Sequence, residues 1–146
     1  MSQKLIDIAK AIFTILVFSL FLLLVGCFYI ETVPLSQGVI VNKTFEPAGY
    51  YVQTENNTTL VGKVPITKTR DYIYEYDDRY IITIEGSFFG TEKTTKIYTS
   101  KETYNTVELN DKYSITEKDS TKEPYKKYRY IEGETPLPEL PYIVPD

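Results

Sequence analysis

Histidine and tryptophan are absent from this chain of 146 residues, and cysteine occurs once, at position 27. Without histidine the chain cannot form a Ser-His-Asp triad or a Cys-His pair. A zinc site with the usual histidine and cysteine ligands is excluded as well, because one cysteine cannot complete it. A single cysteine also excludes an intramolecular disulfide, so the packed interior must stabilise the fold. We expect no cofactor and no catalytic activity.

Basic residues are outnumbered in the larger part of the chain. The whole sequence has a formal charge of −4, and residues 31–146 hold 14 Lys or Arg against 19 Asp or Glu, a balance of −5. Proteins that bind nucleic acid gain most of their affinity from basic side chains that neutralise phosphates. The acidic excess therefore argues against a nucleic-acid partner.

One long hydrophobic run is present. Residues 11–30, AIFTILVFSLFLLLVGCFYI, are twenty consecutive residues without a formal charge. A helix rises about 1.5 Å per residue, so this run would reach about 30 Å, the thickness of the hydrocarbon core of a bilayer. The run predicts a single-pass transmembrane helix that anchors the protein in a membrane.

The charges around this run predict its orientation. Lys4 and Lys10 precede it, and no basic residue follows it before Lys43. Positive charge next to a membrane segment favours the cytoplasmic side. We therefore expect residues 1–10 to form a cytoplasmic leader at the bacterial inner membrane, and residues 31–146 to be exported to the periplasm.

Leu24-Val25-Gly26-Cys27, inside the run, resembles the bacterial lipobox. The resemblance implies that Cys27 carries a lipid on its sulfur and becomes the mature N-terminus after cleavage, as in a lipoprotein. Residues 28–30 continue the apolar run, however, where lipoproteins usually change to a polar tether. This favours an uncleaved helix in which Cys27 is one more small hydrophobic residue. Either anchor leaves the rest of the chain bound to the membrane.

The segment after the anchor has the pattern of β-strands. Residues 31–37 form a tether, and residues 38–116 contain short β-branched or alternating runs separated by turn residues. Residues 71–77 and 79–85 alternate with period two, with a turn expected at Asp77-Asp78 between them. Residues 46–59 are expected to form a loop. About six antiparallel strands in a small β-barrel or sandwich are predicted, which makes the chain mainly β.

Several stretches in this order resemble a known group of proteins. They are an N-terminal membrane helix, Gly-Val-Ile-Val-Asn-Lys at 38–43, Tyr-Ile-Ile-Thr-Ile at 80–84, Ile-Tyr-Thr-Ser at 97–100 and Val-Glu-Leu-Asn-Asp-Lys-Tyr at 107–113. They resemble small bacterial and phage membrane-anchored β proteins of unassigned function. Asn110-Asp111 stands where that group tends to have Gly-Asp. The resemblance covers residues 1–116 and implies an architecture but no activity.

Residues 117–146 differ from the β domain. Five of the eight prolines lie between positions 124 and 146, which favours an extended backbone over a helix. Pro136-Leu-Pro-Glu-Leu-Pro-Tyr would fit an aromatic-lined groove of a partner. We favour the alternative, a Pro-rich tail that lies over its own domain and buries Leu137, Leu140, Tyr142 and Ile143.

Tyrosine is the most informative residue type present. There are fourteen, more than a core of this size needs, and tyrosine is favoured at interfaces because it combines apolar area with a polar tip. A protein partner, or a second copy of the chain, is therefore expected. The candidate contact residues are Tyr72, Tyr74 and Tyr76, provided that the Asp71/Glu75 face is the covered one, together with Tyr125, Tyr128 and Tyr130 in the tail.

Four carboxylates cluster in the sequence, at Asp71, Glu75, Asp77 and Asp78. Paired carboxylates can hydrolyse glycosidic bonds, and carboxylate clusters can hold a hard cation. Alternation instead places Asp71, Glu75 and Asp77 in one solvent-facing row, and no loop of calcium-binding spacing accompanies them. No metal site is therefore predicted.

Three functions remain open at this point. The first is a non-enzymatic structural or interaction module that presents an exported β domain to an envelope or virion partner. The second is a phage- or plasmid-borne envelope modifier that blocks a host surface process. The third is a carboxylate-dependent cell-wall hydrolase. The missing histidine and cysteine chemistry favours the first.

Overall fold

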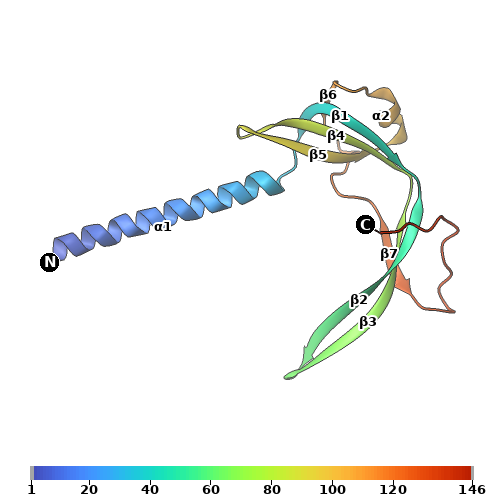
Figure 1. The fold of residues 1–146 in the computed structure, drawn as a ribbon, viewed down its shortest axis with the longest axis horizontal. Helices are drawn as coiled ribbons and strands as arrows, with labels where there is room; N and C mark the ends of the chain where they lie inside the picture. The colour runs from blue at the N-terminus through green and yellow to red at the C-terminus, as the bar shows by residue number, and fades with distance from the viewer. Residues whose placement is uncertain (1, 146) are drawn as a thin grey trace.

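The fold consists of an isolated N-terminal helix followed by two antiparallel sheets (Figure 1). A computed structural model describes residues 2–145. Within them, one sheet has the strand order β5-β4-β1-β6 and the other β2-β3-β7. The expected apolar helix and antiparallel β architecture are confirmed, but the two sheets follow one another along a bent hairpin and form neither a closed barrel nor a face-to-face sandwich (Figure 1). The elements after the helix are β1 (Gln37–Glu46), β2 (Gly49–Val61), β3 (Val64–Tyr76), β4 (Arg79–Phe88), β5 (Thr91–Thr99), α2 (Lys101–Thr106), β6 (Lys112–Ser114) and β7 (Lys126–Tyr130).

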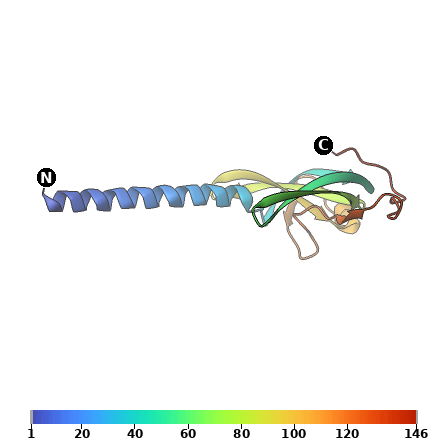
Figure 2. The same ribbon diagram turned by 90° about the horizontal axis from the view of Figure 1, so that it is seen from below.

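The N-terminal helix, α1, runs from Gln3 to Thr32 and extends away from the sheets (Figures 1 and 2). It includes most of the expected leader, because no proline or glycine interrupts the chain before Gly26. It ends at Thr32, with Val33 as its C-cap directly before Pro34, whose ring and missing N–H cannot continue a helix. None of its described residues is buried by the protein. Among residues 2–145 it is the one helix long and apolar enough to cross a membrane.

The two sheets share one long hairpin that bends in the middle. β1 pairs with β4 and β2 with β3, and the register continues across the bend, from Glu46 opposite Arg79 to Gly49 opposite Tyr76. Between β1 and β2, Pro47 interrupts the ladder because it has no N–H to donate. Between β3 and β4, Asp78 accepts a hydrogen bond of 2.8 Å from the Ala48 amide. We call this bend the elbow.

The expected turn at Asp77-Asp78 is therefore wrong. The chain reverses at Gly62, which has a φ of 67°, a conformation that glycine adopts without strain. Residues 46–59 are also not a loop, since most of them belong to β2. They were misassigned because this part of β2 is exposed on both faces and holds polar residues, which pair across the strands, as in the 2.9 Å hydrogen bond between Thr58 and Thr67.

The hydrophobic core lies in the four-stranded sheet. Four isoleucines there have no exposed surface, and Leu35 joins them. The Leu35 amide donates a 2.9 Å hydrogen bond to the Thr95 hydroxyl inside this core. The expected tether at residues 31–37 is thus partly packed into the domain. The isoleucines are Ile40, Ile82, Ile84 and Ile97.

Residues 101–106, within the segment for which only strands and turns were expected, form the short helix α2. The Ser100 side chain caps it by accepting a 3.2 Å hydrogen bond from the Thr103 amide. A helix of six residues is too short to show helical periodicity, so this local cap was its main sequence signal.

The C-terminal residues complete the three-stranded sheet. β7 pairs with β3, so the β domain extends beyond the expected boundary at residue 116. On the other edge of that sheet, the Tyr50 amide donates to the Pro141 carbonyl at 3.0 Å, and the Ile143 amide donates to the Tyr50 carbonyl at 2.7 Å. A side chain at Gly49 would meet Ile143, because a Cβ there would lie 2.3 Å from the Ile143 Cγ1. The tail therefore lies on its own domain, but the expected burial is only partly correct. Leu140 and Ile143 are half-buried, whereas Leu137 and Tyr142 are exposed, because the backbone hydrogen bonds hold the tail along the edge of the sheet.

Candidate interaction surface

Four tyrosines from three segments pack together beside the elbow. Tyr51 on β2 lies opposite Tyr74 on β3, and their rings stack at 4.9 Å between centroids. Tyr76 lies two residues further along β3 on the same face. Tyr125, just before β7, contacts both, at 5.5 Å from the Tyr74 ring and 5.8 Å from the Tyr76 ring. We call these four residues the tyrosine cluster.

The cluster has a buried base and an exposed rim. Tyr74 and Tyr76 are buried, whereas Tyr125 is exposed. Burial is the main cause that raises the pKa of the Tyr76 hydroxyl, and the hydrogen bond with Tyr51, at 3.4 Å, adds to it. The face that carries Tyr74 and Tyr76 is thus covered by the protein itself. Of these residues, Tyr125 offers surface to a partner.

A salt bridge fixes β7 against the rest of this sheet. The Lys127 ammonium lies 2.7 Å from Glu55 Oε1 and 4.5 Å from the centroid of the Tyr72 ring. Tyr74 donates to the same carboxylate. The hydrogen bond from Lys127, and then the one from Tyr74, lower the pKa of Glu55. Both partners are therefore charged at neutral pH, and Tyr72 is half-buried beneath the ammonium group.

The remaining two candidate tyrosines lie on the opposite face of the sheet. Tyr128 pairs with Ile73 and Tyr130 with Asp71. Ile73 and Asp71 alternate along β3 with Tyr72 and Tyr74, so they and their partners lie on the other face. The Tyr128 hydroxyl donates a 3.0 Å hydrogen bond to Glu75. The structure therefore groups Tyr72, Tyr74, Tyr76 and Tyr125 on one face and separates them from Tyr128 and Tyr130.

An open groove of about 750 Å³ lies at the elbow, next to the tyrosine cluster. The side chain of Arg79 lines it and is nine-tenths buried. The guanidinium pairs with Glu46 at 3.2 Å and with Glu123, and it lies 4.4 Å from the centroid of the Tyr76 ring. Its Nε has no hydrogen-bond partner among the described residues. Other lining residues are Pro47, Tyr51, Tyr98, Pro141, Tyr142 and Pro145.

The charges in this groove balance. Arg79 and Lys96 face Glu46 and Glu123, so neither sign dominates. A buried polar group normally has a hydrogen-bond partner, and the buried Nε–H of Arg79 has none among the described residues. A neutral groove with aromatic and proline walls suits an extended peptide.

The clustered carboxylates serve the fold. Asp71 accepts a hydrogen bond of 2.6 Å from Thr54, and Asp78 and Glu75 accept those described above. Asp77 is exposed. Within residues 2–145 no group of three or more His, Cys, Asp or Glu side chains is arranged to hold a metal ion.

The end of α1 is fixed to the β4–β5 hairpin. Lys93 donates to the backbone carbonyls of Ile30, at 2.6 Å, and Glu31, at 3.0 Å, which caps the end of the helix. The Tyr29 ring lies 6.0 Å from Phe88. Cys27, the candidate for lipidation, lies two residues before Tyr29 in uninterrupted helix and is exposed.

Sequence reasoning missed Tyr51, Arg79 and Glu123 as residues of this site, and it named Tyr142 only as part of the tail. The first lies in a stretch that was expected to be a loop, and the others come from separate segments that only the elbow brings together. Comparison with protein-family models, with curated proteins and with solved structures finds no match to this chain. The residues described above therefore carry the functional inference.

Proposed function

We propose that this protein is a membrane-anchored recognition module without catalytic activity. In this proposal α1 crosses the membrane, and the elbow groove holds an extended segment of a protein partner on the far side. The observation that carries the proposal is the groove itself, with its aromatic and proline walls and its balanced charges.

The anchoring part of the proposal is supported by α1. Its apolar surface has no cover within the protein, and Tyr29 stands near its end, where aromatic residues favour the membrane surface. Lys4 and Lys10 keep the N-terminus in the cytoplasm, so residues 31–146 are exported across the bacterial inner membrane. We favour an uncleaved helix over a lipid on Cys27, because α1 continues through this residue to the contacts with Lys93.

The recognition part is supported by the surroundings of the groove. Tyr142 lines it and is exposed, and the exposed Tyr125 contacts Tyr76 in its wall. Tyrosines and arginine are the residue types that contribute most to binding at protein interfaces. Residues 141–145 of the chain itself line one side of the groove, and Tyr142 there forms a parallel β-bridge with Tyr50.

Site-specific photocrosslinking in native membranes tests this function. A photoreactive amino acid replaces Tyr142 or Tyr125 in the full chain, and the matched control position is Leu109, which is exposed and does not line the groove. We expect one partner to be captured from both tyrosine positions and not from position 109. Adding Tyr51→Ser should reduce the yield about tenfold, as expected for the loss of about 1.4 kcal/mol of binding energy.

The identity of the crosslinked protein identifies the partner. Capture of a second copy of this chain would mean that the protein forms a homo-oligomer, which is still protein recognition through the groove. Equal capture from position 109, or no adduct at all together with measurable turnover of glycan or peptide by the purified chain, would contradict the proposal.

A further inference from the structure

The tip of the β2–β3 hairpin exposes apolar side chains to solvent. Leu60, Val61 and Val64 are 70%, 60% and 63% exposed, and Ile66 beside them is exposed as well. In this part of the hairpin β2 and β3 pair only with each other, because β7 reaches no further along β3 than Asp71. An exposed group of large apolar residues at the end of a projecting element indicates a contact with something outside the protein.

The same hairpin is cationic within an acidic domain. Residues 56–70 contain Lys63, Lys68 and Arg70 and no acidic residue. The rest of residues 31–146 contains 11 basic and 19 acidic residues, a balance of −8. The surface that the hairpin tip contacts should therefore be both apolar and anionic.

The position of the tip relative to α1 points to the nature of that surface. The β2–β3 hairpin swings back from the elbow, and its tip lies level with the C-terminal end of α1 along the long axis of the molecule (Figures 1 and 2). The tip of the β4–β5 hairpin lies on the same side, next to the helix, and carries Phe89, which is 75% exposed. Both exposed apolar tips thus face the side from which α1 leaves the domain.

We propose that the tip of the β2–β3 hairpin docks on the surface of the bilayer that α1 crosses. This inference rests on the proposed function in one respect, since α1 must be the anchor. Leu60, Val61 and Val64 enter the headgroup region, where shallow insertion buries apolar side chains. Lys63, Lys68 and Arg70 lie against anionic lipid headgroups, which attract basic segments close to the membrane.

Two features favour lipid over a protein at this tip. A bilayer is the one large surface whose level is fixed by α1 itself, and the tip reaches that level without any change in the fold. Anionic headgroups also supply the negative charge that complements the hairpin. A second contact at a distance from the helix would hold the domain at a fixed angle to the membrane and would thereby orient the elbow groove.

The absence of tryptophan makes the test specific, because a single Leu60→Trp substitution introduces the only tryptophan of the chain. The full chain is reconstituted into nanodiscs of phosphatidylcholine and phosphatidylglycerol with brominated acyl chains, which quench tryptophan on contact. The control is Leu109→Trp, another exposed leucine, placed just after α2. We expect at least about twofold quenching at position 60, from insertion into the headgroup region, and little quenching at position 109.

The charge of the lipid and the charge of the hairpin should both affect the quenching at position 60. Quenching at position 60 should fall in discs of phosphatidylcholine alone, and also when Lys63→Glu and Lys68→Glu are added. Equal quenching at positions 60 and 109 would overturn the proposal. A blue-shifted but unquenched tryptophan at position 60 would also overturn it, because that signal indicates contact with protein. Failure of anchoring is separable, since the chain would then leave the discs during gel filtration.

Discussion

Replacing Ile82 by alanine should lower the free energy of unfolding by about 2–5 kcal/mol. Ile82 has no exposed surface and lies in the centre of β4, where it pairs with Ile97 of β5 and packs in the core with Ile40 and Ile84. Truncation removes buried methyl groups and leaves a cavity that strands on both sides prevent from closing. Because domains of this size are stable by only about 5–15 kcal/mol, the variant should be severely destabilised.

The measurement is urea-induced unfolding of the full chain in detergent micelles. Ile66→Ala is the matched control, because Ile66 lies on the exposed hairpin and its truncation should change stability by no more than about 0.5 kcal/mol. Similar losses for the two variants would mean that the four-stranded sheet does not hold the core described above.

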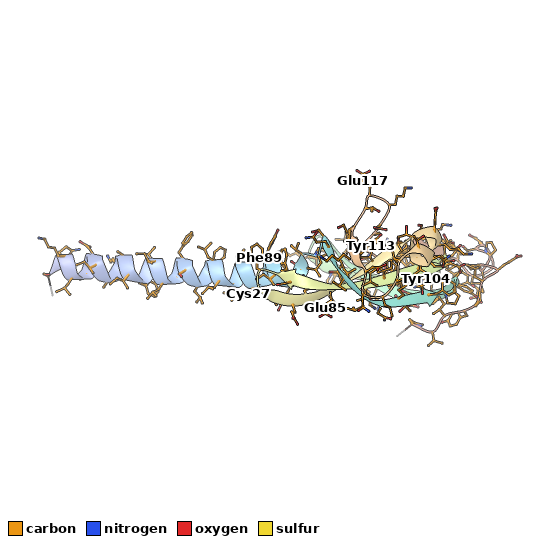
Figure 3. All side chains as sticks on the ribbon, turned by 90° about the horizontal axis from the view of Figure 1, so that it is seen from above. Cys27, Glu85, Phe89, Tyr104, Tyr113 and Glu117 are labelled. Carbon is orange, nitrogen blue, oxygen red and sulfur yellow. The ribbon has the colours of Figure 1, made fainter. Side chains whose placement is uncertain are left out.

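Replacing Asp119 by alanine should cost about 3 kcal/mol, the upper end for the loss of hydrogen bonds to a charged group. This carboxylate accepts four hydrogen bonds, from the Thr99 hydroxyl at 2.7 Å, the Tyr113 hydroxyl at 2.7 Å, the Thr116 amide at 2.9 Å and the Thr116 hydroxyl at 3.0 Å. It therefore joins the loop at residues 116–120 to β5 and β6. Glu117→Ala is the control, since Glu117 is exposed and points away from the domain (Figure 3).

Asp119 also makes the stability of the folded state depend on pH. Burial raises the pKa of Asp119, but the hydrogen bonds from Thr116, Thr99 and Tyr113 outweigh it, and the pKa lies below its ordinary value of 3.8. A carboxyl with a lowered pKa stabilises the folded state above its unfolded pKa. Its contribution is thus complete at pH 5 to 7, declines below about pH 3.8 and is lost as the pH falls through the folded pKa. In thermal melts from pH 6 to 2, the melting temperature of Asp119→Ala should decline less steeply with falling pH than that of the unchanged protein. Parallel plots of melting temperature against pH for the two proteins would contradict this role.

The parts of the fold that the sequence predicted are those with a continuous or an alternating apolar pattern. The apolar run of α1 and the alternating isoleucines of β4 are patterns of consecutive residues that can be read directly from the sequence. β2 was missed because its polar residues are exposed on both faces, so no alternation marks it. β7 was not counted among the strands because it is short and highly charged, and its pairing partner β3 lies more than fifty residues away.

The candidate site was predictable only in part. Period two correctly placed Tyr72, Tyr74 and Tyr76 on one face of a strand. Their burial was not predictable, because the covering residues Tyr51 and Tyr125 come from other segments. The elbow, which creates the groove, depends on a register that continues from one sheet into the other, and such long-range pairing leaves no local signal.

The central claim is that an uncleaved α1 anchors an exported β domain, and one labelling experiment tests it most directly. Leu109→Cys is expressed in a Gram-negative bacterium, the intact spheroplasts are treated with a membrane-impermeant maleimide, and the intact mass of the extracted protein is measured. We expect the full chain with one label, since Leu109 is exposed in the structure and the proposed topology puts it on the far side and Cys27 within the bilayer. A chain that is labelled only after lysis, or that lacks residues 1–26 and carries a diacylglyceryl group on Cys27, would contradict the claim.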